Sequence, residues 1–221
     1  MRDPTTDATP QGISTRRLEA FSDGVFAIVI TLLVLEIRVP QIPHPHADVE
    51  LFHLLLRMWP KFLSFAVSFV IVGIFWVGHH NIFHVIRHTD RALLWLNLFF
   101  LLCVAFIPFP TALMGEYVGV PAAVVPYGLT LMATGLTLYL LWWYATFRRR
   151  LVSPDLDPAF VRMVSRRTLA GPLLYVLAIL LSLVSARITL LVYALIPLYF
   201  ILPHRLDPHL ARHSAARREG G

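Results

Sequence analysis

Residues 17–37 read RLEAFSDGVFAIVITLLVLEI, and this stretch decides the fold. From Phe21 to Leu35 it is almost wholly apolar and long enough for most of a bilayer crossing. Asp23 nevertheless lies in its first turns, and an aspartate inside a membrane helix costs about 2.5–3.5 kcal/mol on insertion scales. A chain that keeps this carboxylate must either satisfy it inside the protein or use it.

The composition indicates an integral membrane protein. Of the 221 residues, 57% are hydrophobic and only 14% are charged, whereas a soluble domain carries about 25% charged residues. Cys103 is the single cysteine, which excludes a disulfide framework or a cysteine metal cluster within one chain. We expect no cofactor, no bound metal and no enzymatic activity. The net charge of +6 does not indicate a nucleic-acid partner, because the basic residues sort by membrane side.

Apolar runs of about 17–25 residues predict an all-α, six-helix membrane bundle over residues 16–205. The predicted spans lie near residues 19–37, 60–79, 92–113, 122–146, 168–186 and 188–203. Residues 48–60 predict a short amphipathic helix outside the membrane. The tails, residues 1–15 and 206–221, are predicted to be disordered on the cytoplasmic side.

The distribution of basic residues predicts the orientation. If the N-terminus is cytoplasmic, most of the 19 lysine and arginine residues lie on that side of the membrane. The far side then holds only Arg38, Arg57, Lys61 and Arg187. The positive-inside rule therefore predicts a multi-pass protein of the cell membrane with both termini in the cytoplasm and an even number of spans.

The first predicted helix has two distinct faces at 100° per residue. Its apolar stripe, spaced by three and four residues, consists of Phe21, Val25, Ile28, Leu32 and Leu35. Thr31 flanks this stripe and Arg17 joins its cytoplasmic end. Asp23 falls roughly opposite, with Ser22 between. One face is therefore a plain apolar ladder, and the other carries a carboxylate that needs partners.

Candidate partners for Asp23 lie near the same membrane boundary. The second span ends with Trp76, His79 and His80, and the third begins with Asn97 at similar depth. A buried network of these groups would satisfy each of them, which favours a structural role for Asp23. A direct ion-binding or proton-carrying role for Asp23 stays open.

The run Arg17-x-x-x-Phe21-Ser22-Asp23, followed by Gly24, resembles the signature of the transmembrane protein 175 family, which are potassium channels of lysosomes and bacteria. Ile28 and Thr31 extend the resemblance along the same helix. Eukaryotic members carry two six-helix repeats, whereas this chain has one. It thus resembles the bacterial type, which implies a homotetramer around one pore in membrane lipid.

The resemblance implies roles for individual residues. The family's pore is lined by the first helix, so its hydrophobic layers would fall on Ile28, Leu32 and Leu35, with Thr31 beside the constriction. The motif residues Arg17, Phe21, Ser22 and Asp23 would brace that helix. No TVGYG-like loop is present, so selectivity would come from a narrow apolar throat. The implied function is a leak-type channel that passes potassium and, less well, other monovalent cations.

Two other functional classes stay in view. A secondary transporter or proton-coupled relay could use the intramembrane aspartate and histidines, although broken helices and inverted repeats are not evident. A metal enzyme is a further alternative, because His80, His84 and His88 are spaced by four residues and could share a helix face. No H-E-x-x-H sequence accompanies them, so we interpret them as polar groups at a helix end.

Overall fold

The computed structural model describes residues 14–41 and 47–202, and it is built from helices. The elements are α1 (Thr15–Leu35), α2 (Ala47–Arg57), α3 (Trp59–Val85), α4 (Arg91–Phe106), α5 (Pro108–Glu116), α6 (Pro121–Thr146), the 3-10 turn η2 (Phe147–Arg149), α7 (Pro158–Ser182) and α8 (Ala186–Ile201). In the described ranges the β pairing is limited to an isolated bridge between Ile86 and Val152. The all-α prediction is confirmed. The predicted disordered tails fall almost entirely outside the described residues, and α1 already begins at Thr15.

The predicted spans map onto these helices with three adjustments. Five stretches in the described chain are long and apolar enough to cross a membrane, and α8 is a shorter apolar helix of 16 residues. The third span consists of α4 and α5, which meet at Ile107, because Pro108 cannot donate a backbone hydrogen bond there. The fifth span begins ten residues earlier than predicted, at Pro158. Asp157 caps it by accepting a hydrogen bond from the Ala159 amide at 2.8 Å.

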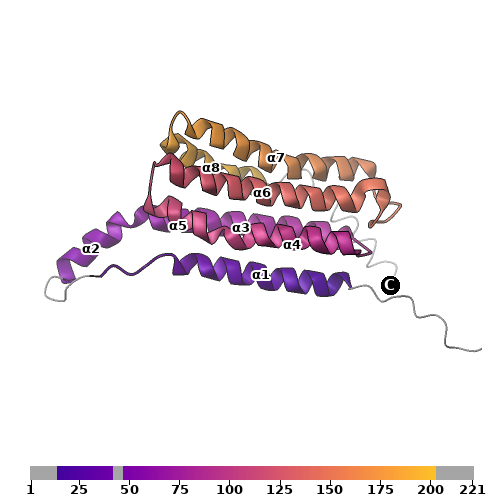
Figure 1. Ribbon diagram of the computed structural model, residues 1–221, viewed down its shortest axis with the longest axis horizontal. Coiled ribbons are helices and arrows are strands. Elements are labelled where there is room, and N and C mark those ends of the chain that lie inside the picture. The colour runs from indigo at the N-terminus through magenta and orange to yellow at the C-terminus, as the bar shows by residue number, and fades with distance from the viewer. Residues whose placement is uncertain (1–13, 42–46, 203–221) are drawn as a thin grey trace, which may run out of the picture.

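The helices run roughly alongside one another, with α1 at one edge and α7 at the opposite edge (Figure 1). Helices α3, α4 and α5 lie between α1 and the group formed by α6, α7 and α8. Helix α1 packs mainly on α3, α4 and α5. Helix α2, at the position predicted for the amphipathic helix, extends outward from one end of the bundle (Figure 1). Within residues 14–41 and 47–202, one side of α1 therefore has no helix beside it.

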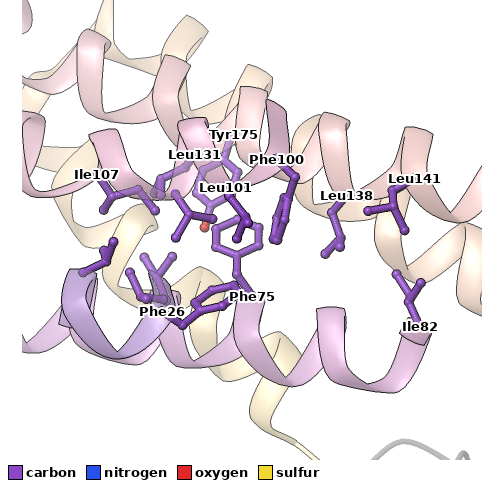
Figure 2. Close-up of a cluster of buried hydrophobic side chains, with 14 of the residues drawn as sticks. Phe26, Phe75, Ile82, Phe100, Leu101, Ile107, Leu131, Leu138, Leu141 and Tyr175 are labelled. Atoms are coloured by element: carbon purple, nitrogen blue, oxygen red, sulfur yellow. The ribbon is translucent and has the colours of Figure 1, made fainter. Parts of the chain in front are cut away.

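The part of the core in Figure 2 is formed by buried side chains from α1, α3, α4, α6 and α7. Phe26 of α1 packs against Phe100 of α4 at a ring-centroid distance of 5.9 Å, and Phe75 of α3 packs against the same ring at 6.4 Å. In a bilayer such contacts stabilise the bundle through van der Waals packing rather than through transfer from water. This core seats the inner face of α1.

The loop from α3 to α4 is fixed by Asp90 outside the membrane-spanning segments. One Asp90 oxygen caps α4 by accepting from the Leu93 amide at 2.8 Å, and the other accepts from the Tyr144 hydroxyl at 2.5 Å. The Arg150 guanidinium lies 3.6 Å from the carboxylate. Partial burial acts to raise the pKa of Asp90, but these hydrogen bonds and Arg150 outweigh it, so the pKa lies below its ordinary value.

Candidate functional site

The buried face of α1 is a stripe of residues that the sequence analysis did not single out. Its members are spaced by three and four and consist of Leu18, Ser22, Phe26, Val29 and Leu33. Periodicity alone could not distinguish this stripe from the predicted apolar ladder, because nearly every face of α1 is apolar. The contacts with α3, α4 and α5 decide which face is packed.

The predicted apolar ladder lies on the open side of α1. Ile28 is 60% exposed and Leu35 is 70% exposed, and Phe21 and Leu32 are exposed as well. Val25 differs from the other members because it is half-buried and packs against the core. In the part of the chain that the structure describes, this row of large apolar side chains on α1 therefore has no partner.

Thr31 is exposed on α1, beside this row. Its hydroxyl donates to the backbone carbonyls of Ile28 at 2.8 Å and Ala27 at 3.1 Å. Because its only hydrogen is used inside the helix, Oγ1 can offer just its lone pairs to whatever it faces. Thr31 therefore presents an oxygen acceptor on the open side of α1.

A chain of buried hydrogen bonds joins α1 to α4 and α3. Asn97 Nδ2 donates to Ser22 Oγ at 3.0 Å, and Asn97 Oδ1 lies 2.9 Å from His79 Nε2. Ser22 and Asn97 are 0% exposed and His79 is 1% exposed. Since an amide oxygen only accepts, Nε2 of His79 carries the proton in this arrangement. We call these three residues the Ser22–Asn97–His79 relay.

Aromatic rings hold His79 in place within the relay. The His79 ring stacks on Phe83 at 4.3 Å between centroids, and it lies nearly parallel to Phe100 at 5.5 Å. Phe26 of α1 approaches it at 5.9 Å. The relay is thereby fixed in orientation and shielded from solvent by residues of α1, α3 and α4.

Asp23 lies outside this relay. It is exposed, and Trp76 Nε1 of α3 donates to its Oδ1 at 2.9 Å. His80 stacks on Trp76 at 6.0 Å between ring centroids. The structure thus divides the predicted partners of the motif into two groups. Trp76 bonds Asp23 and carries His80 stacked on it, whereas Asn97 bonds Ser22 and His79.

Arg17 stands apart from both groups. It is exposed, and no carboxylate in the described part of the chain lies within ion-pairing distance of it. Phe21 is exposed on the same open side as Ile28. The first helix is therefore braced by Ser22 and Asp23, while these other two motif residues face outward.

A second buried polar cluster was missed in the sequence. Thr111 of α5 donates to Ser68 of α3 at 2.9 Å and Ser68 lies 2.9 Å from the Tyr127 hydroxyl of α6. In the sequence these residues are single hydroxyl groups inside apolar runs, and such a pattern only weakly indicates a buried polar cluster. Together with the ion pair between Lys61 and Glu116, the cluster holds α5 against α3 beyond the break at Ile107.

The histidine metal site considered from the spacing does not form. Helix α3 ends at Val85, so His88 lies beyond it and does not share a face with His80 and His84. Within residues 14–41 and 47–202, no group of three histidine, cysteine, aspartate or glutamate side chains is placed to hold a metal ion. The four-residue spacing predicts a shared face only inside a helix, and α3 ends before His88.

Comparisons with known proteins extend these observations. A family model described as the endosomal/lysosomal potassium channel TMEM175 matches residues 17–108. A potassium channel of Streptomyces collinus is 43% identical over 190 residues, which cover 83% of this chain and 90% of that protein.

A solved structure and a human protein are also similar. The crystal structure of a lysosomal potassium-selective channel TMEM175 homologue from Chamaesiphon minutus matches with a TM-score of 0.76 at 39% identity, covering 85% of this chain and 96% of that one. The human endosomal/lysosomal proton channel TMEM175 is 41% identical over 101 residues, which are 43% of this chain and 20% of that protein.

Proposed function

Because the chain belongs to the TMEM175 channel family, we propose that copies of it assemble around one axis into a potassium-permeable leak-type channel. The observation that carries this proposal is the open row of apolar side chains on α1, led by Ile28 and Leu35. One such row cannot enclose a pore, so several copies must face one another with cyclic symmetry. We propose a homotetramer as the assembly.

The row would form the narrowest part of the pathway. Ile28, Leu32 and Leu35 are separated by about 6 Å and 4.5 Å along the helix axis, so in a ring they would form three stacked apolar layers. Apolar constrictions gate by dewetting and provide no oxygen ligands. Selectivity for potassium over sodium is then modest and depends on the cost of shedding water, with the lone pairs of Thr31 as the nearby oxygen ligands.

The hydrogen bonds on the other faces of α1 would fix the rotation of this helix about its axis. Asn97 donates to Ser22 and the Trp76 indole donates to Asp23, both in the N-terminal half of α1. Rotation of α1 by one residue would move Ile28 by 100°. We therefore assign Ser22 and Asp23 a positioning role and Ile28 a role in the constriction.

Placement in the membrane follows the charge distribution. We propose that residues 16–205 form the channel unit of a multi-pass cell-membrane protein, with the start of α1 and the end of α8 on the cytoplasmic side. Both lie at the same end of the bundle in Figure 1, as an even number of passes requires. The arginine-rich turn around η2 is at that end too.

Reconstitution into liposomes with potassium, sodium and caesium gradients tests the proposed function. We expect current whose reversal potential follows the potassium gradient and an Ile28→Asn variant with weaker discrimination between potassium and sodium. Leu177→Asn is the matched control, because Leu177 is 63% exposed on α7 at the opposite edge. An unchanged permeability ratio in Ile28→Asn would remove Ile28 from the constriction.

Proton permeation is the second candidate, favoured by the human relative's description as a proton channel. A pH gradient imposed in the same liposomes separates the two: a reversal potential that follows the proton gradient favours proton permeation. Saturating uptake that requires the proton gradient would instead indicate a transporter.

A further inference from the structure

A cavity of about 580 Å³ lies between α3 and the helices α6, α7 and α8. Its walls run along α3 from Val70 to Ile82 and along α7 from Phe160 to Tyr175, and they are mostly apolar. Glycines help to open it: a Cβ at Gly73 would meet no atom within 4 Å. The volume lies within the range of small-molecule sites in proteins.

Arg167 of α7 places a cation in this apolar wall. The side chain is half-buried, and its Nη2 donates to the backbone carbonyl of Phe200 at 2.6 Å. Among residues 14–41 and 47–202, no carboxylate lies within ion-pairing distance of this guanidinium. A guanidinium has five N–H donors, so most of them are left for another group. A cation beside an apolar cavity is costly without an anion, so the site favours an anionic ligand.

Arg167 lies where the short helix α8 ends, and we place the membrane interface at that level. Helix α8 ends beside it, at Ile201, whereas α7 begins at Pro158 and extends about 14 Å further in that direction. Arg162 and Arg166 lie on this extension. From Arg167 toward Tyr175 the cavity continues for about 12 Å along apolar α7, close to the ~15 Å of hydrocarbon in one leaflet.

We propose that this cavity binds one anionic phospholipid from the leaflet on the arginine-rich side. The lipid phosphate accepts hydrogen bonds from the Arg167 guanidinium, a geometry that arginine and phosphate share well. One acyl chain fills the cavity between α3 and α7, against Gly73 and Tyr175. An anionic lipid is favoured over a zwitterionic one because it brings no ammonium group to oppose the arginines.

The rival role for Arg167 is to cap α8. The Phe200 carbonyl belongs to the last turn of α8, where a cation is favourable. A cap predicts that Arg167 substitutions lower thermal stability and leave lipid content unchanged. Lipid retention therefore separates the two roles, and it does not depend on whether the protein conducts ions.

The test is native mass spectrometry of the full chain. The protein is reconstituted in nanodiscs of equal phosphatidylglycerol and phosphatidylcholine, extracted in mild detergent, and its retained lipids are counted per chain. We expect about one retained phosphatidylglycerol per chain. In Arg167→Gln this retention falls about tenfold, while Arg167→Lys keeps part of it. Arg166→Gln, an exposed neighbour, matches the wild-type protein.

A second variant keeps the proposal testable if Arg167→Gln does not fold. Gly73→Leu fills the cavity without touching Arg167, and we expect it to lose the lipid while the protein elutes as the wild-type oligomer. Gly73→Ala adds one methyl group and should lose much less. Equal retention of phosphatidylcholine and phosphatidylglycerol by the wild-type protein would overturn the proposal. Unchanged phosphatidylglycerol in both Arg167→Gln and Gly73→Leu would overturn it too.

Discussion

The α1 edge and the α7 edge of the bundle both expose large apolar side chains, but they are held in different ways. Helix α1 is held in its N-terminal half by hydrogen bonds from α4 and α3 side chains to Ser22 and Asp23. Helix α7 accepts a hydrogen bond from Trp142 of α6 at Ser165, and it also lies close to α6 at Gly135, where a Cβ would come within 3.0 Å of the Pro172 side chain. Trp76 of α3 belongs to both regions, since it bonds Asp23 and lines the cavity near α7.

This difference shows that exposure alone does not identify a pore-facing helix. Ile28 and Leu177 are about equally exposed, yet α7 packs more extensively on α6 and α8 than α1 does on its neighbours. Within the part of the chain that the structure describes, α1 is the more loosely packed of the two helices, and its open face has no partner. A helix held in that way is suited to meet copies of itself. A helix packed closely on two neighbours of its own chain, as α7 is on α6 and α8, is suited to face lipid with its open side.

The largest expected effect comes from breaking the relay. Asn97→Leu leaves His79 and Ser22 without their partner in a buried site, which should cost about 2–4 kcal/mol of stability. We expect loss of the oligomer on size exclusion and a lower melting temperature. Asn81→Leu, the same substitution at an exposed position of α3, is the control. Equal behaviour of the two variants would contradict the role of the relay.

The next largest expected effect is a loss of stability when the packing at the α7 edge is disturbed. A Cβ at Gly128 of α6 would collide with the Tyr193 hydroxyl and with Ile179, so Gly128→Ala should cost about 1–3 kcal/mol. We expect a lower melting temperature and unchanged ion selectivity in the protein that survives. Gly73→Ala, where a Cβ meets nothing within 4 Å, should melt like the wild-type protein. Altered selectivity in Gly128→Ala would erase the distinction between the two edges.

The Asp23–Trp76 hydrogen bond should matter less than the relay because it is exposed. Asp23→Ala and Trp76→Phe should each reduce the yield of oligomer, and a double-mutant cycle should give a coupling of about 1 kcal/mol. Asp23→Asn keeps an accepting oxygen and should preserve most of the yield. A well-assembled Asp23→Ala oligomer that fails only in conduction would instead assign that carboxylate to the ion pathway.

The spans and the open face of α1 could be predicted from the sequence, because both depend on local composition and on the helical period. The helical period places Ile28 and Leu35 on one stripe, and both side chains are exposed in the structure. The packed face of α1 could not be predicted, since a membrane helix is apolar on several sides and only its neighbours decide which side is buried. The Ser68–Thr111 contact and the cavity beside Arg167 depend on residues far apart in the chain, and no local pattern encodes them.

The smallest effect is a pH dependence at Asp90. Its pKa is lower in the folded protein than its ordinary value, so its contribution is complete above the unfolded pKa and is lost as pH falls through the folded pKa. The stability difference between the wild-type protein and Asp90→Asn should therefore shrink below about pH 4. Thermal melts from pH 3 to 7 measure it. A difference that persists unchanged to pH 3 would contradict the hydrogen-bonded carboxylate.

Thiol accessibility during conduction tests most directly whether the open row of α1 lines the pathway. Ile28→Cys, Leu35→Cys and Leu177→Cys are made in a Cys103→Ala background, and current is recorded before and after a charged, membrane-impermeant thiol reagent. We expect the current to fall for both α1 variants and to stay unchanged for Leu177→Cys. Unchanged current at both α1 positions, or an equal loss at Leu177→Cys, would contradict it.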